Sequence, residues 1–431
     1  MNISNIDLCY RNINNIENIN EKLKIFRKDF DCRMKKDVSN VRAKSKKTTT
    51  RIKTRKIEKV KNVSQIDMPL LITVLMLLAI GIIMVLSASA PSALAMFGDS
   101  YKYAKTQGIA SIAGICCMIF FSIFDHKHFK KWYKVFYVIG VLLLFTVKIP
   151  GLGVSSNGAT RWIKIGLQIQ PSEITKICMI LFFAGYFTDE KNDTSGLWKG
   201  YLLPLLLIVL PVYILYKVQN HMSAGILLVI ITLAIMIMAG CKMKYIMTTI
   251  AAAGGVGVLA LIFFRDKLTG SFRTDRIQAW LNTEENARGS GYQTLQSLYA
   301  IGSGGLFGVG LGESKQKYLY IPEAHNDFIF AILAEELGFV GCLIVLILFA
   351  IFTVRGVLIS MKADDMFGSL MAIGITTLIS SQAILNIAVV TNTIPNTGIS
   401  LPFLSYGGSS IIILLSCVGI LLNISKTTKK I

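Results

Sequence analysis

Long apolar runs without charge recur along the chain after its first 67 residues, and short polar segments separate them. A helix needs about 20 apolar residues, each rising 1.5 Å, to cross the hydrocarbon of a bilayer. The pattern therefore predicts an all-α integral membrane protein with ten transmembrane helices. The expected spans are 69–90, 106–124, 132–147, 172–188, 200–216, 222–240, 245–264, 327–354, 366–390 and 408–424.

Residues 1–67 have a different character, because they are polar, basic and without a long apolar run. They hold 18 of the 45 Lys and Arg residues and 8 of the 25 Asp and Glu residues. We expect a disordered cytoplasmic tail, since no apolar core of a signal peptide lies near Met1. Its basic charge would either fix the membrane topology or attract an anionic leaflet. No nucleic-acid partner is expected, because no recognition fold accompanies the charge.

Composition excludes two broad classes. Only 16% of the 431 residues are charged and 53% are hydrophobic, whereas soluble domains carry roughly a quarter charged residues. A soluble protein is therefore excluded. Six of the 8 cysteines lie in or beside apolar runs, where a free thiol behaves as a small hydrophobe, so a secreted disulfide scaffold is excluded as well.

Charge sets the expected orientation. With the N-terminus inside, the short inner loops hold 13 Lys and Arg and the short outer segments hold 6, which satisfies the positive-inside rule. Both termini are then cytoplasmic, in a plasma-membrane protein whose membrane domain is 68–425 and whose C-terminus is 426–431. The loop 265–326, between helices 7 and 8, is extracytoplasmic. Apolar anchors favour order in it, and its glycine-rich stretch 302–312 favours tight turns and close backbone approach.

Ionisable groups near membrane spans are costly and are functional candidates by default. Glu173 and Lys176 lie three residues apart, on one face of the helix that Pro171 begins. Such a pair either neutralises itself as a structural contact or serves function. Arg161 precedes it, in an amphipathic segment expected at the outer interface. Arg and Lys together would bind an anionic headgroup, phosphate above all.

A second group of ionisable residues surrounds the start of the eighth span. Asp327 and Glu335 are spaced to lie on one helical stripe of small and acidic residues. Desolvation would raise the pKa of Asp327, which suits a general base near neutral pH, and nearby cations would lower it. The structural alternatives are a helix cap for Asp327 and contacts between helices for Glu335. His325, in the same segment, is a candidate for substrate contact.

The remaining polar features divide into site candidates and solvated groups. The uncharged segment 395–410, rich in Pro and Gly, predicts a re-entrant or broken element beside the polar site. His126 and His128 lie in a basic inner loop and are expected to be solvated, while His221 is expected to be structural. The candidate loop cations are Arg273, Arg276, Lys315 and Lys317.

Several strings together resemble the SEDS family (shape, elongation, division and sporulation), which includes FtsW, RodA and SpoVE. They occur in family order and cover roughly residues 66–425. The string PEAHNDFIFA, starting at Pro322, is nearest to the FtsW/SpoVE branch. Many relatives have an acid where this chain has His221, so an acidic role there does not carry over. The strings lie at 158–176, 291–298, 302–312, 314–317, 322–338 and 395–410.

The resemblance implies ten helices and peptidoglycan glycosyltransferase activity on lipid II at the outer face of the membrane, in division or sporulation septal wall synthesis. It implies a class B penicillin-binding protein (a transpeptidase) as partner, beside membrane lipids and other divisome or sporulation membrane proteins. It assigns the family's essential acid to Asp327. The family's Arg-Trp, Pro-Ser-Glu and following Lys correspond to Arg161-Trp162, Pro171-Ser172-Glu173 and Lys176.

The hypothesis is an inverting transfer in which Asp327 deprotonates the acceptor hydroxyl. The leaving polyprenyl pyrophosphate needs charge neutralisation, for which Arg161 and Lys176 are the first candidates and the loop cations the next. A divalent cation (Mg or Mn) could share this work, although the sequence shows no clear metal ligands. The alternatives are a lipid II flippase or other transporter, a RodA-type elongation polymerase, and a scaffold that activates a partner enzyme.

Overall fold

The computed structural model describes residues 66–427, apart from 157–158, 166, 193, 195, 250, 253–254, 256–275, 277–278, 286–288 and 290. The described residues belong to one compact unit. The predicted disordered tail up to residue 65, most of the expected span 245–264, the end of the C-terminal segment and Arg273 lie outside them.

The described chain is mostly helical, as the apolar runs predict. Acidic side chains cap two of the long helices: the Leu70 amide donates to Asp67 Oδ1 at 3.0 Å, and the Gly368 amide donates to Asp365 Oδ2 at 2.9 Å. The helices are α2 (Met68–Phe97), α3 (Lys102–Ile123), α4 (Lys127–Lys130), α5 (Tyr133–Phe145), η1 (Thr146–Lys148), α6 (Pro171–Thr188), η2 (Trp198–Leu202), α7 (Leu203–Lys217), α8 (Met222–Met238), α11 (Tyr292–Gly304), α12 (Ile329–Lys362), α13 (Met366–Val390) and α14 (Gly408–Lys426).

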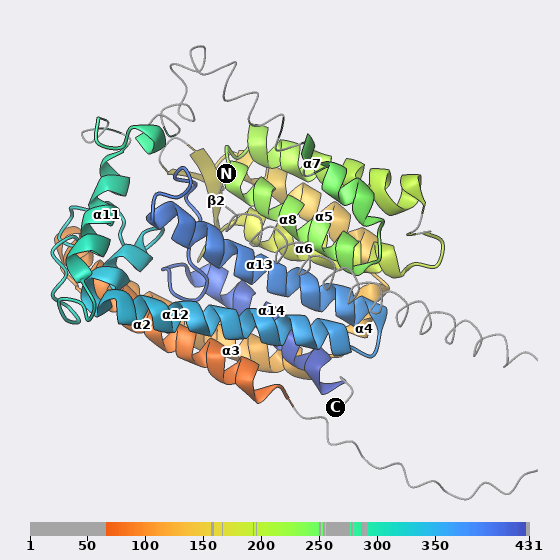
Figure 1. Ribbon diagram of the computed structural model, residues 1–431, viewed down its shortest axis with the longest axis horizontal. Helices are drawn as coiled ribbons and strands as arrows, with labels where there is room; N and C mark the ends of the chain where they lie inside the picture. The colour runs from red at the N-terminus through yellow and green to blue at the C-terminus, as the bar shows by residue number, and fades with distance from the viewer. Residues whose placement is uncertain are drawn as a thin grey trace, which may run out of the picture. The chain divides into compact units, whose positions relative to one another are not determined.

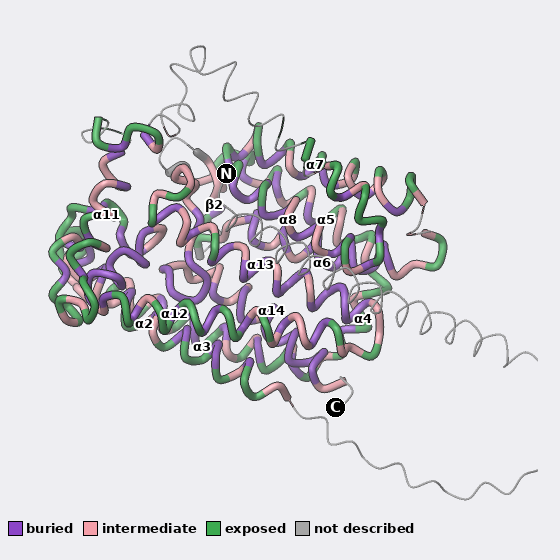
Figure 2. The backbone as a smooth tube through the Cα atoms, viewed as in Figure 1, coloured by how far each residue is buried: buried purple, intermediate pink, exposed green. Residues whose placement is uncertain are grey.

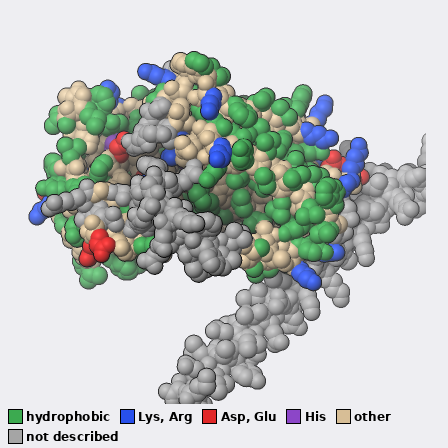
Figure 3. All heavy atoms as spheres, turned by 90° about the horizontal axis from the view of Figure 1, so that it is seen from above, with side chains coloured by type: hydrophobic (Ala, Val, Ile, Leu, Met, Phe, Trp, Pro, Cys, Tyr) green, Lys and Arg blue, Asp and Glu red, His purple; other side chains and the backbone are tan. Residues whose placement is uncertain are grey.

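Within the described ranges, 6 helical segments are long and apolar enough to cross a membrane. They are α2, α3, the continuous η2–α7 segment, α12, α13 and α14, and α8 is apolar but shorter. Helices α5 and α6 lie at two more of the expected spans. The chain is therefore a multi-pass membrane protein. Hydrophobic side chains cover most of the described surface seen in Figure 3, which suits contact with lipid.

A small antiparallel sheet of order β1-β2-β3 interrupts the helices where the sequence predicted an amphipathic interfacial segment. Its strands are β1 (Gly153–Ser156), β2 (Ala159–Ile165) and β3 (Leu167–Ile169). In β2, Ile163 is buried and Lys164 is exposed, the alternation of a strand with one covered face. This sheet departs from the all-α prediction, because a run so short does not distinguish the strand period from the helix period.

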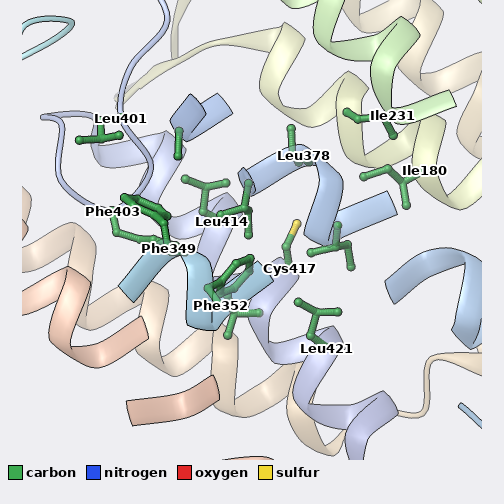
Figure 4. Packing of buried hydrophobic residues seen from close by; sticks show 14 of the residues in the cluster. Ile180, Ile231, Phe349, Phe352, Leu378, Leu401, Phe403, Leu414, Cys417 and Leu421 are labelled. Atoms are coloured by element: carbon green, nitrogen blue, oxygen red, sulfur yellow. The ribbon is translucent and has the colours of Figure 1, made fainter. Parts of the chain in front are cut away.

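The most buried elements are α6, α13 and α14. Helix α6 packs against α5, α8 and α13, while α14 packs along α3 and α12 packs against both α2 and α13. Figure 2 shows the buried residues concentrated where these helices face one another. In Figure 4, Ile180 of α6, Ile231 of α8, Phe352 of α12, Leu378 of α13 and Cys417 of α14 point into this shared core.

The elements outside the helical layer gather at two ends. Figure 1 shows the sheet, α11 and the start of α12 at one end, and α4 with the end of α14 at the other. We call these the sheet end and the α4 end. Helices α6, α8, α12 and α14 all begin at the sheet end. Because a helix N-terminus carries partial positive charge, four such termini face this end.

Two polar contacts join α2 to α12 near the two ends of their apolar runs. Toward the α4 end, Arg355 Nε donates to Asp67 Oδ1 at 3.1 Å. Toward the sheet end, Ser87 Oγ donates to Glu336 Oε1 at 2.6 Å. On each helix about 20 residues separate the contacts, or about 30 Å. The hydrocarbon of a bilayer has this thickness, so we take the two contacts to mark its edges.

Helix α12 is broken at Gly338, which has φ 66° and ψ −165°. The break leaves backbone groups free to pair with residues 305–312, which we call the glycine loop. A Cβ on Gly338 would lie 2.3 Å from the Gly308 nitrogen, so the pairing requires glycine. The hydrogen bonds run from Val309 N to Glu335 O (2.9 Å), Gly310 N to Glu336 O (3.1 Å), Phe339 N to Gly305 O (2.9 Å) and Val340 N to Leu306 O (3.1 Å).

The expectation that His126 is solvated is wrong. Its side chain is fully buried at the α4 end, where Nδ1 lies 2.8 Å from Asn423 Oδ1 and Nε2 lies 3.0 Å from Asp365 Oδ1. Burial alone would lower the pKa of His126, but the contacts with Asp365 and Asn423 outweigh it and the pKa is raised. Its partners are remote in the chain, so local sequence does not reveal the pairing. His128 is exposed, as expected.

We expect Gly338→Ala to destabilise the fold, because the added Cβ would meet the backbone of the glycine loop. The apparent melting temperature in detergent should fall by about 2 °C or more. Gly302→Ala is the matched control, since a Cβ on this glycine of α11 meets nothing within 4 Å. Equal shifts for the two variants would contradict the role given to the break.

Candidate functional site

Asp327 lies at the sheet end, just before α12, in a turn whose backbone is bound by a side chain of α13. Asn386 Nδ2, from α13, donates to the backbone oxygen of Asp327 at 2.8 Å and to that of Ile399 at 2.6 Å. One amide group therefore joins the turn to the segment 391–407, which connects α13 to α14. Asp327 is not a helix cap, because the capping position belongs to Phe328.

The connecting segment 391–407 has no helix, as the sequence predicted for most of it. Its residues Leu401 and Phe403 are buried, and a Cβ on Gly81 of α2 would lie 2.1 Å from the Phe403 backbone oxygen. Gly81 is about 9 Å along α2 from Ser87, at 1.5 Å per residue. The segment therefore enters the bundle below the edge of the hydrocarbon, where protein must satisfy its backbone.

Gly398, in the same segment, separates the carboxylate of Asp327 from the guanidinium of Arg161. A Cβ placed on it would lie 3.3 Å from Asp327 Oδ2 and 3.9 Å from Arg161 Nη1. Its φ of +66° also favours glycine. The absence of a side chain at this position leaves the two charged groups facing a common space.

Two arginines surround the carboxylate of Asp327. Arg161 Nη2, from β2, donates to the Asn220 backbone oxygen at 2.8 Å, and Arg276 Nη1 donates to the Asn396 backbone oxygen at 3.0 Å. Backbone carbonyls thus orient both guanidinium groups. Arg161 Nε, which is buried, has no hydrogen-bond partner in the described part of the chain.

The pKa of Asp327 is raised from 3.8 to about 6. Burial is the largest cause and the nearby Glu323 adds to it, while Arg161 and Arg276 pull the pKa down. At neutral pH the group is mostly ionised but readily accepts a proton. A carboxyl of this kind beside fixed cations can take a proton from a bound hydroxyl while an anion lies close by.

His221 lies in the same cluster of cations. It is buried at the start of α8, and its pKa is well below 6.5 because of burial first and then Arg161, Lys176 and Arg276. The imidazole is therefore neutral at physiological pH. Its Nδ1 has no hydrogen-bond partner among the described residues. It adds no negative charge, so the cluster keeps the charge of its arginines.

Glu173 and Lys176 form a buried ion pair of 2.8 Å on one face of α6, close to its start. The helical spacing in the sequence predicted the shared face. Glu173 Oε2 and the hydroxyl of Ser172 are buried and without hydrogen-bond partners in the described ranges. The electrostatic effect of Lys176 on His221 connects this pair to the arginine cluster.

His325 belongs to an aromatic group beside Asp327. Its ring centroid lies 4.5 Å from that of Tyr103 and 5.6 Å from that of Tyr406. Burial lowers the pKa of His325, opposed by Glu323. Sequence reasoning did not select Tyr103 of α3, because this helix meets the turn only in the folded bundle, whereas Tyr406 lies within the segment 395–410 that was expected beside the polar site.

Other predicted site residues lie with the glycine loop. Glu335 accepts hydrogen bonds from the Ser314 hydroxyl and from the Lys315 amide, the latter at 2.9 Å. Lys317 Nζ pairs with Glu336 Oε1 at 2.9 Å, and both side chains are buried. These contacts hold residues 312–317 against α12 and do not direct Lys317 or Glu335 toward Asp327. Among the predicted site residues of this stretch, Lys315 is the one whose side chain is exposed.

A protein-held metal ion does not fit the donor set around Asp327. A single carboxylate with guanidinium groups beside it offers too few oxygen ligands for Mg or Mn, which prefer several. Within the described ranges no group of three or more His, Cys, Asp or Glu side chains gathers in a metal-binding arrangement.

Sequence relatives cover nearly all of the described chain. A family model described as cell cycle protein, spanning FtsW, RodA and SpoVE, matches residues 68–430. Stage V sporulation protein E of Bacillus subtilis (strain 168) is 42% identical over 366 residues, covering 84% of this chain and 98% of the relative. A probable peptidoglycan glycosyltransferase FtsW of Trichlorobacter lovleyi is 40% identical over 368 residues, covering 85% and 94%.

Solved structures share the fold. A chain from the structure described as "Structural coordination of polymerization and crosslinking by a peptidoglycan synthase complex" superposes with a TM-score of 0.70 at 23% identity, covering 84% of this chain and 97% of that one. The rod shape determining protein RodA of Thermus thermophilus superposes with a TM-score of 0.61 at 23% identity, covering 85% and 98%.

Asp327→Asn should stabilise the protein at neutral pH. Because the folded pKa of about 6 exceeds the ordinary 3.8, the contribution of Asp327 to the parent's stability is most favourable below about pH 4 and is lost as pH rises through 6. The melting temperature of the variant relative to the parent should therefore be higher at pH 7.5 than at pH 4.5. Asp364→Asn, an exposed acid at the α4 end, is the control and should show no such difference. A difference of the opposite sign would contradict the raised pKa.

Proposed function

This chain belongs to the family of cell cycle proteins FtsW, RodA and SpoVE, and from that membership we propose that it is a peptidoglycan glycosyltransferase. It would polymerise lipid II into glycan strands in the septal wall of dividing or sporulating cells. The relatives named FtsW and stage V sporulation protein E support this branch. The single observation that carries the proposal is the carboxyl of Asp327, with a pKa near 6, facing Arg161 across Gly398.

In the proposed reaction Asp327 accepts the proton of the acceptor sugar's 4-hydroxyl. The acceptor oxygen bonds to the anomeric carbon of the donor as the bond from that carbon to the pyrophosphate oxygen breaks. The electron pair leaves with the polyprenyl pyrophosphate, and the configuration at the carbon inverts. A positioned base contributes about 10²–10⁴ in rate.

The pyrophosphate already exists as a stable anion, so it needs neutralisation and not protonation. Arg161 and Arg276 are oriented for this by backbone carbonyls, and the N-termini of α6, α8, α12 and α14 add positive potential. Lys176 would contribute less, since Glu173 balances its charge. A neutral His221 would add no charge of its own beside the leaving group.

We propose different roles for the remaining residues that the sequence predicted at the site. The aromatic group of His325, Tyr103 and Tyr406 offers ring faces for a sugar beside Asp327. Lys315 and Arg273 are proposed to attract substrate from the loop. Lys317 and Glu335 are proposed to position residues 312–317 against α12, because Lys317 pairs with Glu336 and Glu335 accepts a hydrogen bond from the Lys315 amide.

We further propose ten spans with both termini cytoplasmic and the sheet end outside the plasma membrane. The domains would be the tail 1–67, the membrane domain 68–425 and the C-terminus 426–431. Asp327 precedes Glu336, at the proposed outer edge of the hydrocarbon, so it would lie at the level of lipid headgroups. The pyrophosphate of a polyprenyl lipid lies at the same level.

The proposed partner is a class B penicillin-binding protein, a transpeptidase that cross-links the strands. The likeness in fold to a chain of a peptidoglycan synthase complex supports this association. Other divisome or sporulation membrane proteins are proposed as further neighbours. The buried Glu173–Lys176 pair favours one rival function, a lipid II flippase, because buried ion pairs are typical of transport pathways.

Polymerisation of purified lipid II in proteoliposomes with the cognate transpeptidase tests the proposal. Asp327→Asn should lower the rate by about 10²–10⁴ while leaving partner binding unchanged. Glu323→Gln, an exposed acid in the same turn, is the control and should retain polymer. Normal polymer from Asp327→Asn would remove the base from the mechanism. Lipid II flipping without polymer from the parent protein would favour the transporter, and activation of the partner alone would favour the scaffold.

Comparing Arg161→Gln with Lys315→Gln tests whether a cation beside Asp327 matters more for activity than an exposed cation on the loop. Arg161 faces Asp327, so its loss should lower kcat/KM for lipid II by about tenfold or more. Lys315 is exposed on the loop, where screening limits its effect to about twofold. Initial rates over a range of lipid II concentrations measure both. A larger loss for Lys315→Gln would move the leaving-group site to the loop.

A further inference from the structure

The glycine loop pairs with α12 through its backbone, while its large side chains are exposed. Two of its amides and two of its carbonyls meet backbone groups freed by the break at Gly338, through the hydrogen bonds given above. A segment whose backbone is satisfied by protein can enter hydrocarbon without the large cost of unpaired polar groups. The pairing therefore lowers the cost of placing this loop at the edge of the lipid.

The position of the loop along α12 matches the edge of the hydrocarbon. It pairs with residues 335–340, which include Glu336. The Ser87–Glu336 contact lies about 30 Å from the Asp67–Arg355 contact by helical rise. This is the thickness of the hydrocarbon, so the loop lies at the boundary between acyl chains and headgroups.

The exposed side chains of the loop are apolar and without charge. Leu306 is 66% exposed, Phe307 79%, Val309 45% and Leu311 58%. They continue the exposed apolar face of α12, where Phe339 is 59% exposed. Soluble surfaces rarely carry so many large apolar groups together, whereas a segment lying in a membrane interface needs them.

We propose that residues 305–312 form a membrane-interface segment whose apolar side chains insert among the acyl chains of the leaflet at the sheet end. The continuity with the lipid-facing side of α12 favours acyl chains over a protein as occupant. Glu313 and Lys315, which follow the loop and are exposed, would return the chain to the headgroups. The inference does not depend on the reaction proposed above.

Photo-crosslinking in vesicles tests this placement. The full-length chain carrying Phe307→p-benzoylphenylalanine is reconstituted in phosphatidylethanolamine and phosphatidylglycerol, irradiated and digested, and lipid adducts are measured by mass spectrometry. The same substitution at Phe339 is the positive control and at Glu323 the aqueous control. Adducts at position 307 should be within about threefold of those at 339 and about tenfold or more above those at 323.

Leu311→p-benzoylphenylalanine provides a second position in the loop, and size-exclusion profiles show that each variant is folded. Adducts at 307 and 311 no more abundant than at 323, with 339 labelled, would overturn the proposal. Protein adducts in place of lipid adducts, in vesicles or in cells that contain the partner proteins, would assign the surface to a protein and would overturn it equally.

Discussion

The requirement that polar groups within a membrane find partners in the protein governs this structure. Asp67 binds Arg355 at the α4 end, and Ser87 binds Glu336 toward the sheet end. Lys317 completes the second contact by pairing with Glu336. A charge left without a partner at such depth would cost several kcal/mol. The same requirement explains the glycine loop, whose backbone takes the groups that the break in α12 leaves free.

The candidate site differs from these contacts in how its cations are held. Arg161 and Arg276 are held by backbone oxygens and face one carboxylate, that of Asp327. Arg161 Nε and His221 Nδ1 are buried there without hydrogen-bond partners in the described ranges. Structural polar groups in proteins are nearly always satisfied. Buried groups of this kind beside an acid are candidates for contact with a bound molecule.

Sequence alone located much of this arrangement. The apolar runs gave the positions of the described membrane helices, and helical spacing put Glu173 and Lys176 on one face. The position of Asp327 before an apolar span marked it for attention. Asn386, which fixes its turn, was missed although a polar amide within an apolar span is a visible signal. The sheet was missed because its strands are short. The pairs His126 with Asn423 and Lys317 with Glu336 join distant segments, and only folding brings them together.

A neutral imidazole at His221 bears on how the site responds to its surroundings. With its pKa well below 6.5, this side chain is neutral at physiological pH, and the arginines beside it keep their protons. Asp327, whose pKa is about 6, takes up a proton in a mildly acidic medium. Acidity at the sheet end would therefore remove the carboxylate that faces the arginines.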